Sequence, residues 1–406
     1  MNFQNDIVKD VASQTYCLST GNLELEVFSE DMAGLYKIAE RQNPKRAFLF
    51  VSTVLGRHIP VKPRDHRAVL NILASKVMPL LLQGPAFVMG YAETAVGIGA
   101  GVYDSLRNQI GSGRLGYLHT TRHPVPGEEV WFSIEEGHSH ATHHFIMKPM
   151  GGVCRPGPDA TLILVDDETT TGSTFEQLAL GLKENGAEFG RIILVTMTDW
   201  SSGDAVRRIR KSLGTDQVHA VSLLEGAWTW TQDTGVTPPA LPVLKDPECP
   251  FWEPAFRLEH QSPRMGLKGR QMSNGMYLAM KFGLPRLKRD DRVLVIGSGE
   301  HVWQPFLYAE ALARDSVDVA FIATTRSPIM PGPVIEHKIS FPDHFGIGLD
   351  MYLHNVDPDE WDRIVLFTET ETSGVPEALR RGLGKGYVVD CHGAVSPMLP
   401  KGHCEK

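Results

Sequence analysis

The sequence has few cysteines, no long apolar run and no excess of positive charge. Its five cysteines (Cys17, Cys154, Cys249, Cys391 and Cys404) are odd in number and widely spaced, which argues against a disulfide framework and favours reduced thiols. No run reaches the roughly 18 apolar residues of a membrane-spanning helix. The opening MNFQNDIVKDVASQTY has neither the basic end nor the apolar stretch of a signal peptide. We therefore expect a cytoplasmic protein with no membrane partner.

The charge balance excludes a further class of partner. The chain has 40 Lys and Arg against 48 Asp and Glu, a net charge of −8, so nothing indicates a nucleic-acid partner. The 42% hydrophobic and 22% charged residues are typical of a globular protein and exclude disorder and collagen. A length of 406 residues exceeds the usual size of one domain and predicts two.

Short apolar runs between helical patterns predict parallel strands. These runs lie at 86–90, 115–120, 161–166 and 191–198, and again at 292–297, 319–325, 363–369 and 386–390. After the third run, Phe175, Leu178 and Leu182 share one helical face, and Gly186 suits the C-terminal cap of that helix. A helical pattern also covers 269–282. The order strand, helix, strand predicts an α/β fold with doubly wound, Rossmann-like parallel sheets.

The composition changes between the two series of strands. Segment 215–265 is rich in Pro and Trp, and we expect it to be a connector with one hairpin. The prediction is therefore a first domain at 1–214, a connector at 215–265 and a second domain at 266–406.

The two series of strands resemble copies of one another. Four short groups of residues, here called stations, occur in both series in the same order, and the two members of each pair lie at nearly the same distance along the chain. The pairs are 90–93 with 297–300, 120–124 with 324–328, Ser133 and Glu136 with Ser340 and Asp343, and 165–172 with 367–374. This repetition predicts a duplicated fold. The alternative is that any two doubly wound sheets look alike and that the shared Thr-Thr-Arg-x-Pro is coincidence.

The segment LILVDDETTTGSTFEQL is the most informative motif. Its strand delivers an acid pair, Asp166 and Asp167, to the carboxyl edge of the sheet, where ligands of such sheets bind. The loop that follows has small hydroxyl side chains, a glycine for close approach and a helix start, which together suit a phosphate. The acids suit the hydroxyls of a sugar, or Mg²⁺ held through water. The alternative is a capped helix start with two solvated acids.

This motif resembles the signature with which type I phosphoribosyltransferases bind 5-phosphoribosyl 1-pyrophosphate (PRPP). The segments FLFVSTVLGRHIPV, GYAETAVGIG, EEGHSHATHH and ATTRSP are similar to bacterial phosphoribosyltransferases with a C-terminal TRSP domain, which is named for Thr325, Arg326, Ser327 and Pro328. The resemblance implies a reaction in which a nitrogenous base displaces pyrophosphate from C1 of PRPP, with Mg²⁺ as cofactor. It also implies a link to tellurium-resistance and stress-response operons and to the synthesis of a nucleoside-like compound.

The resemblance assigns roles to particular positions. Asp166 and Asp167 would hold the ribose hydroxyls and, through water, the Mg²⁺. The 5-phosphate would bind the phosphate loop, which comprises Thr169, Thr170, Thr171, Gly172, Ser173 and Thr174. The pyrophosphate would bind the 91–94 loop, which comprises Tyr91, Ala92, Glu93 and Thr94 and is poorer in glycine than other versions.

The departing pyrophosphate gathers negative charge and calls for nearby cations. We expect Arg122 and His123 to meet this charge, with Arg57 and His58 as further candidates.

A His-rich segment lies between the second strand and the acid pair. It contains Glu135, Glu136, His138, His140, His143 and His144. We expect a mobile cover over the site, in which Glu136 or His138 assists proton transfer on the incoming base. The alternatives are a metal site made by His138, His140 and His143, or loop histidines without a role. For 390–393, and for His403 with Cys404, we expect a frayed polar tail.

The second copy differs at the positions that carry chemistry. It offers Thr368 and Glu369 in place of the acid pair, and Val375 and Pro376 replace two hydroxyl residues of the loop. We expect this degenerate copy to have lost PRPP chemistry and, as in the PRPP synthetases that it resembles, to pack on the first with approximate two-fold symmetry. It would form the acceptor side of the site or a dimer surface. Arg326 would hold an anion or brace a loop.

The leading function is thus a phosphoribosyltransferase that acts on PRPP and an unidentified small-molecule acceptor. A hydrolytic or reverse use of the same site is a second reading. A PRPP-sensing regulatory protein is a third, which the absence of a helix-turn-helix or basic patch disfavours. A homodimer is one expected assembly.

Overall fold

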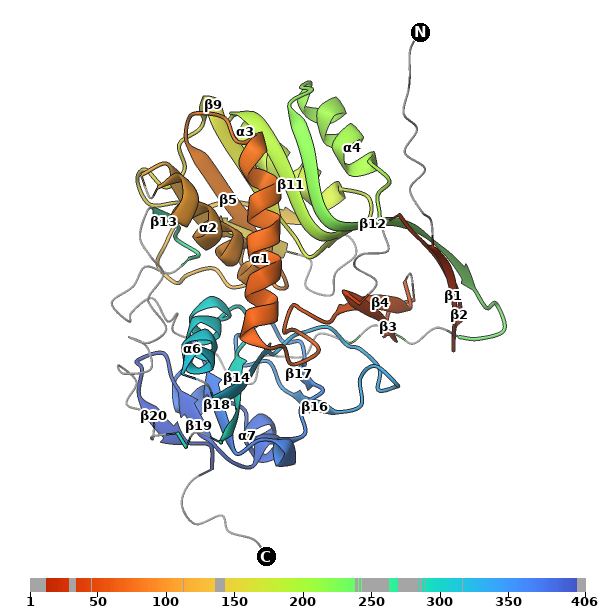
Figure 1. Cartoon of the computed structure of the whole chain (residues 1–406), viewed down its shortest axis with the longest axis vertical. Coiled ribbons are helices and arrows are strands. Elements are labelled where there is room, and N and C mark those ends of the chain that lie inside the picture. The colour runs from red at the N-terminus through yellow and green to blue at the C-terminus, as the bar shows by residue number, and fades with distance from the viewer. Residues whose placement is uncertain are drawn as a thin grey trace, which may run out of the picture.

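The computed structural model describes residues 12–28, 34–44, 46–111, 113–135, 143–237, 240, 242, 263–268, 284, 287–288, 290–315 and 317–399. Figure 1 shows a first half, residues 12–237, above a second half, residues 291–399. Each half is built on its own mainly parallel sheet. Among the helices of the described residues, none combines the length and the apolar character needed to cross a membrane.

The first half is built on a nine-stranded sheet in the order β1-β2-β12-β11-β9-β5-β6-β13, with β10 beside β11. The strands are β1 (Ala12–Leu18), β2 (Gly21–Val27), β5 (Ala86–Gly90), β6 (Leu115–His119), β9 (Gly157–Val165), β10 (Glu168–Thr169), β11 (Phe189–Asp199), β12 (Val218–Gln232) and β13 (Leu267–Lys268). The pairs β6-β5, β5-β9 and β9-β11 are parallel. The strands β5 and β6 are buried throughout, which explains their unbroken apolar runs.

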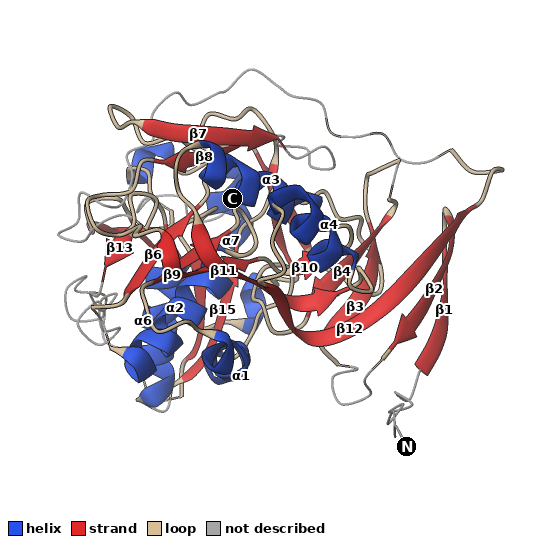
Figure 2. Ribbon diagram, turned by 90° about the horizontal axis from the view of Figure 1, so that it is seen from above, coloured by secondary structure: helices blue, strands red, loops and turns tan. Residues whose placement is uncertain are grey.

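Helices cover both faces of this sheet. Figure 2 shows α1 (Pro63–Val77) and α2 (Val96–Ile110) on one face, and α3 (Ser173–Glu184) and α4 (Asp204–Leu213) on the other. A short 3-10 helix, η2 (Met78–Leu80), follows α1. The helix α2 lies very close to β5, because a Cβ on Gly99 would stand 2.8 Å from the Cα of Gly90. These glycines of GYAETAVGIG therefore serve helix packing.

The structure differs from the expected connector. Residues 218–232 form β12, a long strand that starts parallel to β11 and continues antiparallel to β2. Two tryptophans of β12, Trp228 and Trp230, contact the ring of Phe48, with centroids 5.1 and 5.3 Å away. Phe48 belongs to a separate hairpin of β3 (Tyr36–Glu40) and β4 (Phe48–Ser52). Trp228 and Trp230 are thus partly buried and pack against the core of the first half.

The second half repeats the topology of the first. Its sheet has the order β15-β14-β18-β19-β20, and its elements are β14 (Arg292–Gly297), α6 (Trp303–Arg314), β15 (Asp318–Ala323), β16 (Lys338–Phe341), β17 (Met351–His354), η4 (Pro358–Glu360), β18 (Arg363–Phe367), η5 (Thr372–Gly374), α7 (Glu377–Leu383), β19 (Tyr387–Val389) and β20 (Val395–Pro397). The parallel order β15-β14-β18-β19 matches β6-β5-β9-β11. The hairpin β16-β17 corresponds to the hairpin of β7 (Val130–Glu135) and β8 (His143–Met147). The expected helix at 269–282 lies outside the described residues.

Equivalent hydrogen bonds support the duplication at single positions. The amide of Thr120 donates to Gly90 O and that of Thr324 to Gly297 O, both over 2.9 Å. The Oγ1 of the same threonines accepts an amide from the preceding loop, from Ala92 at 2.9 Å and from Gly299 at 2.8 Å. The predicted duplication is therefore present in the strand order and in the loop bonding.

The two halves share a core. Along β14, Val293 and Val295 join the large cluster that also contains the core of the first sheet, whereas Leu294 and Ile296 join a smaller cluster with α7. This alternation follows from the two-residue period of a strand. At the edge of the shared core, Arg67 of α1 pairs with Glu310 of α6 at 2.7 Å.

Candidate active site

The acid pair lies where β9 ends. Asp166 and Asp167 are partly exposed, and the amide of Asp167 donates to Asp166 Oδ1 over 2.9 Å. The hydroxyl of Thr94 donates to Asp167 Oδ1, also over 2.9 Å. This bond joins the acid pair directly to the 91–94 loop.

The environment of Asp167 disfavours its charge. Burial raises its pKa, and the negative charge of Glu168 raises it further. Glu168 is itself held by Arg46, whose Nη1 and Nη2 donate to its two oxygens over 2.7 and 3.2 Å. A ligand that donates hydrogen bonds, or a cation, would relieve the cost of the Asp167 charge.

The phosphate loop has a tight backbone. Gly172 precedes α3 with φ of 71°, and a Cβ there would lie 2.5 Å from the Cα of Ala205. Because glycine has no side chain, the N-cap position offers no acceptor to the first amides of α3, which is how helix starts that bind phosphate are built. Thr170, Ser173 and Thr174 are partly exposed and Thr171 is exposed. Thr169 is buried instead, and its carbonyl accepts from the amide of Trp200 over 2.8 Å.

Residues of both halves hold the 91–94 loop. The amide of Tyr91 donates to Val165 O over 3.1 Å. Nη1 of Arg326, in the second half, donates to Glu93 Oε2 over 2.9 Å. Arg57 Nη2 donates to Glu93 O over 2.6 Å, and its Nη1 lies 3.4 Å from Glu93 Oε1. The glutamate thus stands between two arginines.

Two further cation candidates lie between the halves. Arg57 is buried, and its Nη1 also donates to the carbonyls of Gly299 and Thr324, over 2.9 and 2.6 Å. His58 is buried beside His354, with ring centroids 5.7 Å apart. Burial, and then the charge of His354, hold the pKa of His58 well below its usual value. His58 is therefore neutral and does not supply the expected positive charge.

The two residues expected to meet the pyrophosphate differ in state. Arg122 Nη1 donates to His143 O over 3.0 Å. His123 is 2% exposed, and its Nε2 lies 3.0 Å from Arg326 Nη2. Burial, and then the charge of Arg326, lower the pKa of His123 to about 3. The structure therefore buries both residues, and His123 is a neutral side chain.

Only part of the His-rich segment falls within the described residues. Glu136, His138 and His140 lie outside them. His143 and Glu135 are exposed, with His143 Nδ1 3.8 Å from Glu135 Oε1. His144 is buried against the site, because its Nδ1 hydrogen-bonds Thr120 Oγ1 over 2.9 Å and its ring meets Tyr91 edge-on. Within the part of the chain that the structure describes, no three His, Cys, Asp or Glu side chains gather to hold a metal ion.

The expected polar tail is partly structured. The stretch 390–393 forms a turn between β19 and β20, in which Asp390 Oδ1 accepts the amides of His392 and Ala394, both over 2.9 Å. Cys391 is buried there, so this stretch is not frayed. His403 and Cys404 lie outside the described residues. Cys17, Cys154 and Cys391 are free thiols, as expected.

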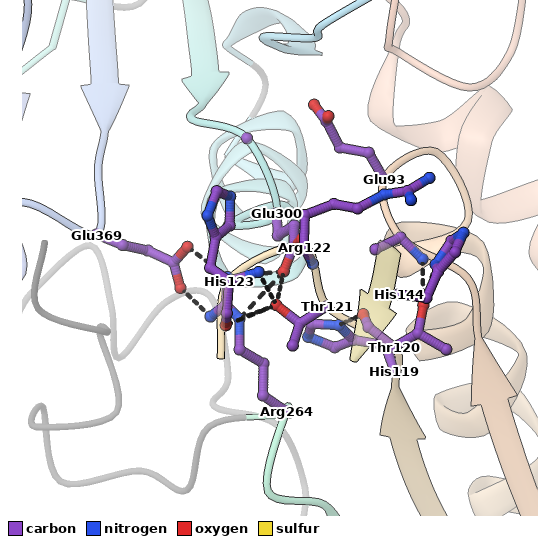
Figure 3. A network of polar contacts seen from close by, with 12 residues as sticks. Glu93, His119, Thr120, Thr121, Arg122, His123, His144, Arg264, Glu300 and Glu369 are labelled. Atoms are coloured by element: carbon purple, nitrogen blue, oxygen red, sulfur yellow. Dashed lines mark hydrogen bonds and ion pairs between the residues drawn. The ribbon is translucent and has the colours of Figure 1, made fainter. Parts of the chain in front are cut away.

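A buried ionic cluster at the junction was not predicted (Figure 3). Arg264 is 2% exposed and lies just before β13. Both of its terminal nitrogens donate to Glu369, and its Nε donates to Glu300 Oε2 over 3.1 Å. Glu300 also accepts from Thr121 Oγ1 over 2.6 Å and from the amide of Arg122 over 2.7 Å. Burial alone would raise the pKa of Glu300, but the charge of Arg264 holds it well below its usual range.

This cluster occupies the carboxyl edge of the sheet in the second half. Glu300 and Glu369 stand at the stations of Glu93 and Asp167, so the guanidinium of Arg264 lies between the two loops that would face a ligand in the second half. The repeat had marked both glutamates as stations. Nothing in the sequence marked Arg264, because it falls in the segment taken for a connector.

Comparisons with known proteins agree with this geometry. Residues 35–227 match the model of the phosphoribosyl transferase family, and residues 262–381 match the TRSP domain that lies C-terminal to it. The chain is a phosphoribosyltransferase with a C-terminal TRSP domain. It is thereby an enzyme of the pentosyltransferase type. A search of curated proteins finds no match.

Solved phosphoribosyltransferase structures align with part of this phosphoribosyltransferase. An APRTase from Giardia lamblia in complex with 9-deazaadenine is 15% identical, with 46% of this chain and 93% of that chain covered and a TM-score of 0.35. The adenine phosphoribosyltransferase of Thermoanaerobacter pseudethanolicus is 17% identical over 48% of this chain and 98% of its own, with a TM-score of 0.32. The orotate phosphoribosyltransferase of Aeropyrum pernix is 16% identical over 44% of this chain and 78% of its own, with a TM-score of 0.27.

The phosphate loop predicts a specific glycine requirement. Gly172→Ala places a side chain on a left-handed backbone and against Ala205, so we expect a loss of well over about 1 kcal/mol of unfolding free energy and weaker binding of ribose 5-phosphate. The matched control is Gly186→Ala, which has φ of 77° and no neighbour within 4 Å of a new Cβ. Equal effects of the two substitutions on denaturation and on calorimetric titration would contradict this account.

The buried cluster predicts a stability role for Glu300. Glu300→Gln leaves Arg264 short of one buried counter-charge, which costs about 3–5 kcal/mol. The lowered pKa of Glu300 means that its contribution is present above the unfolded pKa of about 4.3 and is lost as the pH falls through the folded value. Urea denaturation of wild type and variant between pH 2 and 8 measures this, because the loss falls below the unfolded pKa. The exposed pair of Glu377 and Arg381 supplies the control, since Glu377→Gln should cost no more than about 1 kcal/mol.

The raised pKa of Asp167 predicts the opposite behaviour. Its contribution to stability is present below the unfolded pKa of about 3.9 and is lost as the pH rises through the folded value. Asp167→Asn removes the partly buried charge and keeps an acceptor for Thr94. We expect the unliganded variant to match the wild type at low pH and to melt at a higher temperature near neutral pH. A lower melting temperature of the variant at pH 8 would show that the carboxylate is not under strain.

Proposed function

We propose that this protein transfers the ribose 5-phosphate of PRPP to a nitrogenous base or a related nucleophile, with release of pyrophosphate, in the synthesis of a nucleoside-like compound. One observation carries the proposal. The hydrogen bond from Thr94 to Asp167 joins the acid pair to the 91–94 loop, and the phosphate loop follows the acid pair in the chain. PRPP has its 5-phosphate, ribose hydroxyls and pyrophosphate in the same order.

The described residues divide the binding of PRPP. The phosphate loop offers the hydroxyls of Ser173 and Thr174 and the start of α3 to the 5-phosphate. Asp166 and Asp167 accept hydrogen bonds from the ribose hydroxyls. Arg122 supplies positive charge near the departing pyrophosphate, where charge develops in the transition state. Glu136 and His138 remain the predicted groups for proton transfer on the acceptor.

The acid pair also fits Mg²⁺ held through water. Mg²⁺ keeps several waters and needs only one or two carboxylates when substrate phosphates provide other ligands, so two acids suffice. The raised pKa of Asp167 means that its ionised form is unfavourable in the unliganded site, and a bound cation would stabilise that form. When bound with PRPP, Mg²⁺ would supply charge neutralisation for the pyrophosphate.

The second half has a different part in this proposal. We propose that it is a degenerate copy without PRPP chemistry, because Arg264 lies between its Glu300 and Glu369. We keep the two predicted domains and the connector between them, with the boundary of the first domain moved beyond β12. A cytoplasmic location, a homodimer and the absence of nucleic-acid and membrane partners remain predictions.

Pyrophosphate release from PRPP and Mg²⁺ tests the function, measured over a panel of bases and extracted metabolites. We expect release that depends on one acceptor and that falls by at least about 100-fold in Asp166→Asn and in Asp167→Asn, because the ribose loses a charged acceptor in the transition state. The matched control is Asp216→Asn, since Asp216 is exposed before β12 and far from the carboxyl edge. Release by both acid-pair variants at the wild-type rate would refute the assigned site.

A sensor is the competing outcome of the same experiment. Tight PRPP binding without release for any acceptor would favour a PRPP-sensing protein. Release of pyrophosphate without any acceptor would indicate hydrolysis.

A further inference from the structure

The namesake arginine of the TRSP domain reaches into the first half. Arg326 follows β15 and is 5% exposed. Its Nη1 donates to Glu93 Oε2 over 2.9 Å, and its Nη2 donates to Asp343 Oδ1 over 3.1 Å. The same Nη2 lies 3.0 Å from His123 Nε2. One guanidinium therefore joins the 91–94 loop, the loop after β6 and the second half.

The contact with His123 has a defined polarity. A guanidinium carries donors only, so His123 Nε2 must be the acceptor and its proton must lie on Nδ1. The lowered pKa of His123 agrees with this neutral form. His123 thus orients Arg326 without adding a second positive charge beside it.

Arg326 acts on the loop through Glu93. The carboxylate of Glu93 lies between Arg326 and Arg57, and its carbonyl accepts from Arg57. The next residue, Thr94, donates to Asp167. A continuous path of hydrogen bonds and one peptide link therefore runs from Arg326 through the 91–94 loop to the acid pair.

The opposite contact repeats this arrangement. Glu300, which stands at the station of Glu93, accepts from Thr121 Oγ1 and from the amide of Arg122 in the loop after β6. Arg326 stands in the equivalent loop after β15. Glu93 after β5 thus binds the Thr-Thr-Arg loop of the second half, through Arg326. Glu300 after β14 binds the Thr-Thr-Arg loop of the first half, as Figure 3 shows. Because both halves make the equivalent contact, we infer that the contact between Glu93 and Arg326 is part of how the two halves pack together.

We propose that Arg326 is a positioning residue that holds Glu93, and with it the 91–94 loop, in the form that binds the pyrophosphate of PRPP. The inference rests on the proposed function. It gives the TRSP half a defined part in the reaction, because the pyrophosphate subsite is complete only when both halves are joined.

The test compares ligands that occupy different parts of the site. Isothermal titration measures PRPP, inorganic pyrophosphate and ribose 5-phosphate, each with Mg²⁺, on the full chain. Arg326→Met should weaken PRPP and pyrophosphate by at least about tenfold, since a buried charge pair loses one partner. Ribose 5-phosphate should change less than about twofold, because it uses the acid pair and the phosphate loop. Arg326→Lys should lose less affinity than Arg326→Met, because lysine keeps the positive charge but cannot donate to two partners with the geometry of a guanidinium.

Two further variants separate positioning from mere stability. Arg67→Met removes another arginine that joins the halves, through Glu310, and should lower the melting temperature without a selective loss of pyrophosphate. Glu93→Gln should reproduce the selective loss. The double variant with Arg326→Met should lose less than the two single effects combined, because both act on one interaction. If Arg326→Met does not fold, Glu93→Gln still tests the proposal, because it weakens the same ion pair from the other side.

The possible results are distinguishable. Wild-type protein that binds neither PRPP nor pyrophosphate would overturn the proposed function and this inference together. Wild-type binding of PRPP with equal losses for all three ligands in Arg326→Met would show that the arginine only stabilises the fold. Unchanged pyrophosphate binding in both Arg326→Met and Glu93→Gln would overturn the positioning role and leave the function standing.

Discussion

The structure depends on the burial of acids where two carboxyl edges meet. The loops after β5 and β6 face the loops after β14 and β15, so glutamates of both halves are withdrawn from water at one junction. Buried carboxylates need counter-charges, and three arginines supply them: Arg57, Arg264 and Arg326. Because each arginine contacts both halves, the neutralisation of charge and the joining of the halves are one requirement.

The same requirement explains how two copies of one fold came to differ. In the first copy the acids after β9 remain partly exposed, and the charge of Asp167 is left for a ligand to stabilise. In the second copy Glu369 is buried and receives the guanidinium of Arg264. A side chain of the protein thus takes the place that a ligand would need.

The pattern of apolar residues and glycines along the sequence predicted those elements whose formation depends on neighbouring residues. The parallel strands, helix α3 with Gly186 after its end, and the repeat were all readable, because buried strands need apolar runs and a positive φ favours glycine. The tryptophans of β12 were misread, since only the hairpin β3-β4 shows what covers them. Arg264 and the neutral state of His123 were beyond reach for the same reason. Each depends on partners that lie far away in the sequence.

The Thr-Thr-Arg loop shows how one motif can keep its structure while its chemistry diverges. In both halves the first threonine receives an amide from the preceding βα loop, and the second pairs by backbone bonds with the strand after the hairpin turn, Thr121 with Phe145 and Thr325 with Tyr352. These bonds need the backbone and a hydroxyl, so duplication preserves them. The arginine is not bound by this need. Arg122 turns to its own half, at His143 O, whereas Arg326 crosses to Glu93. Both arginine side chains therefore contact residues of the first half, although one of them belongs to the second.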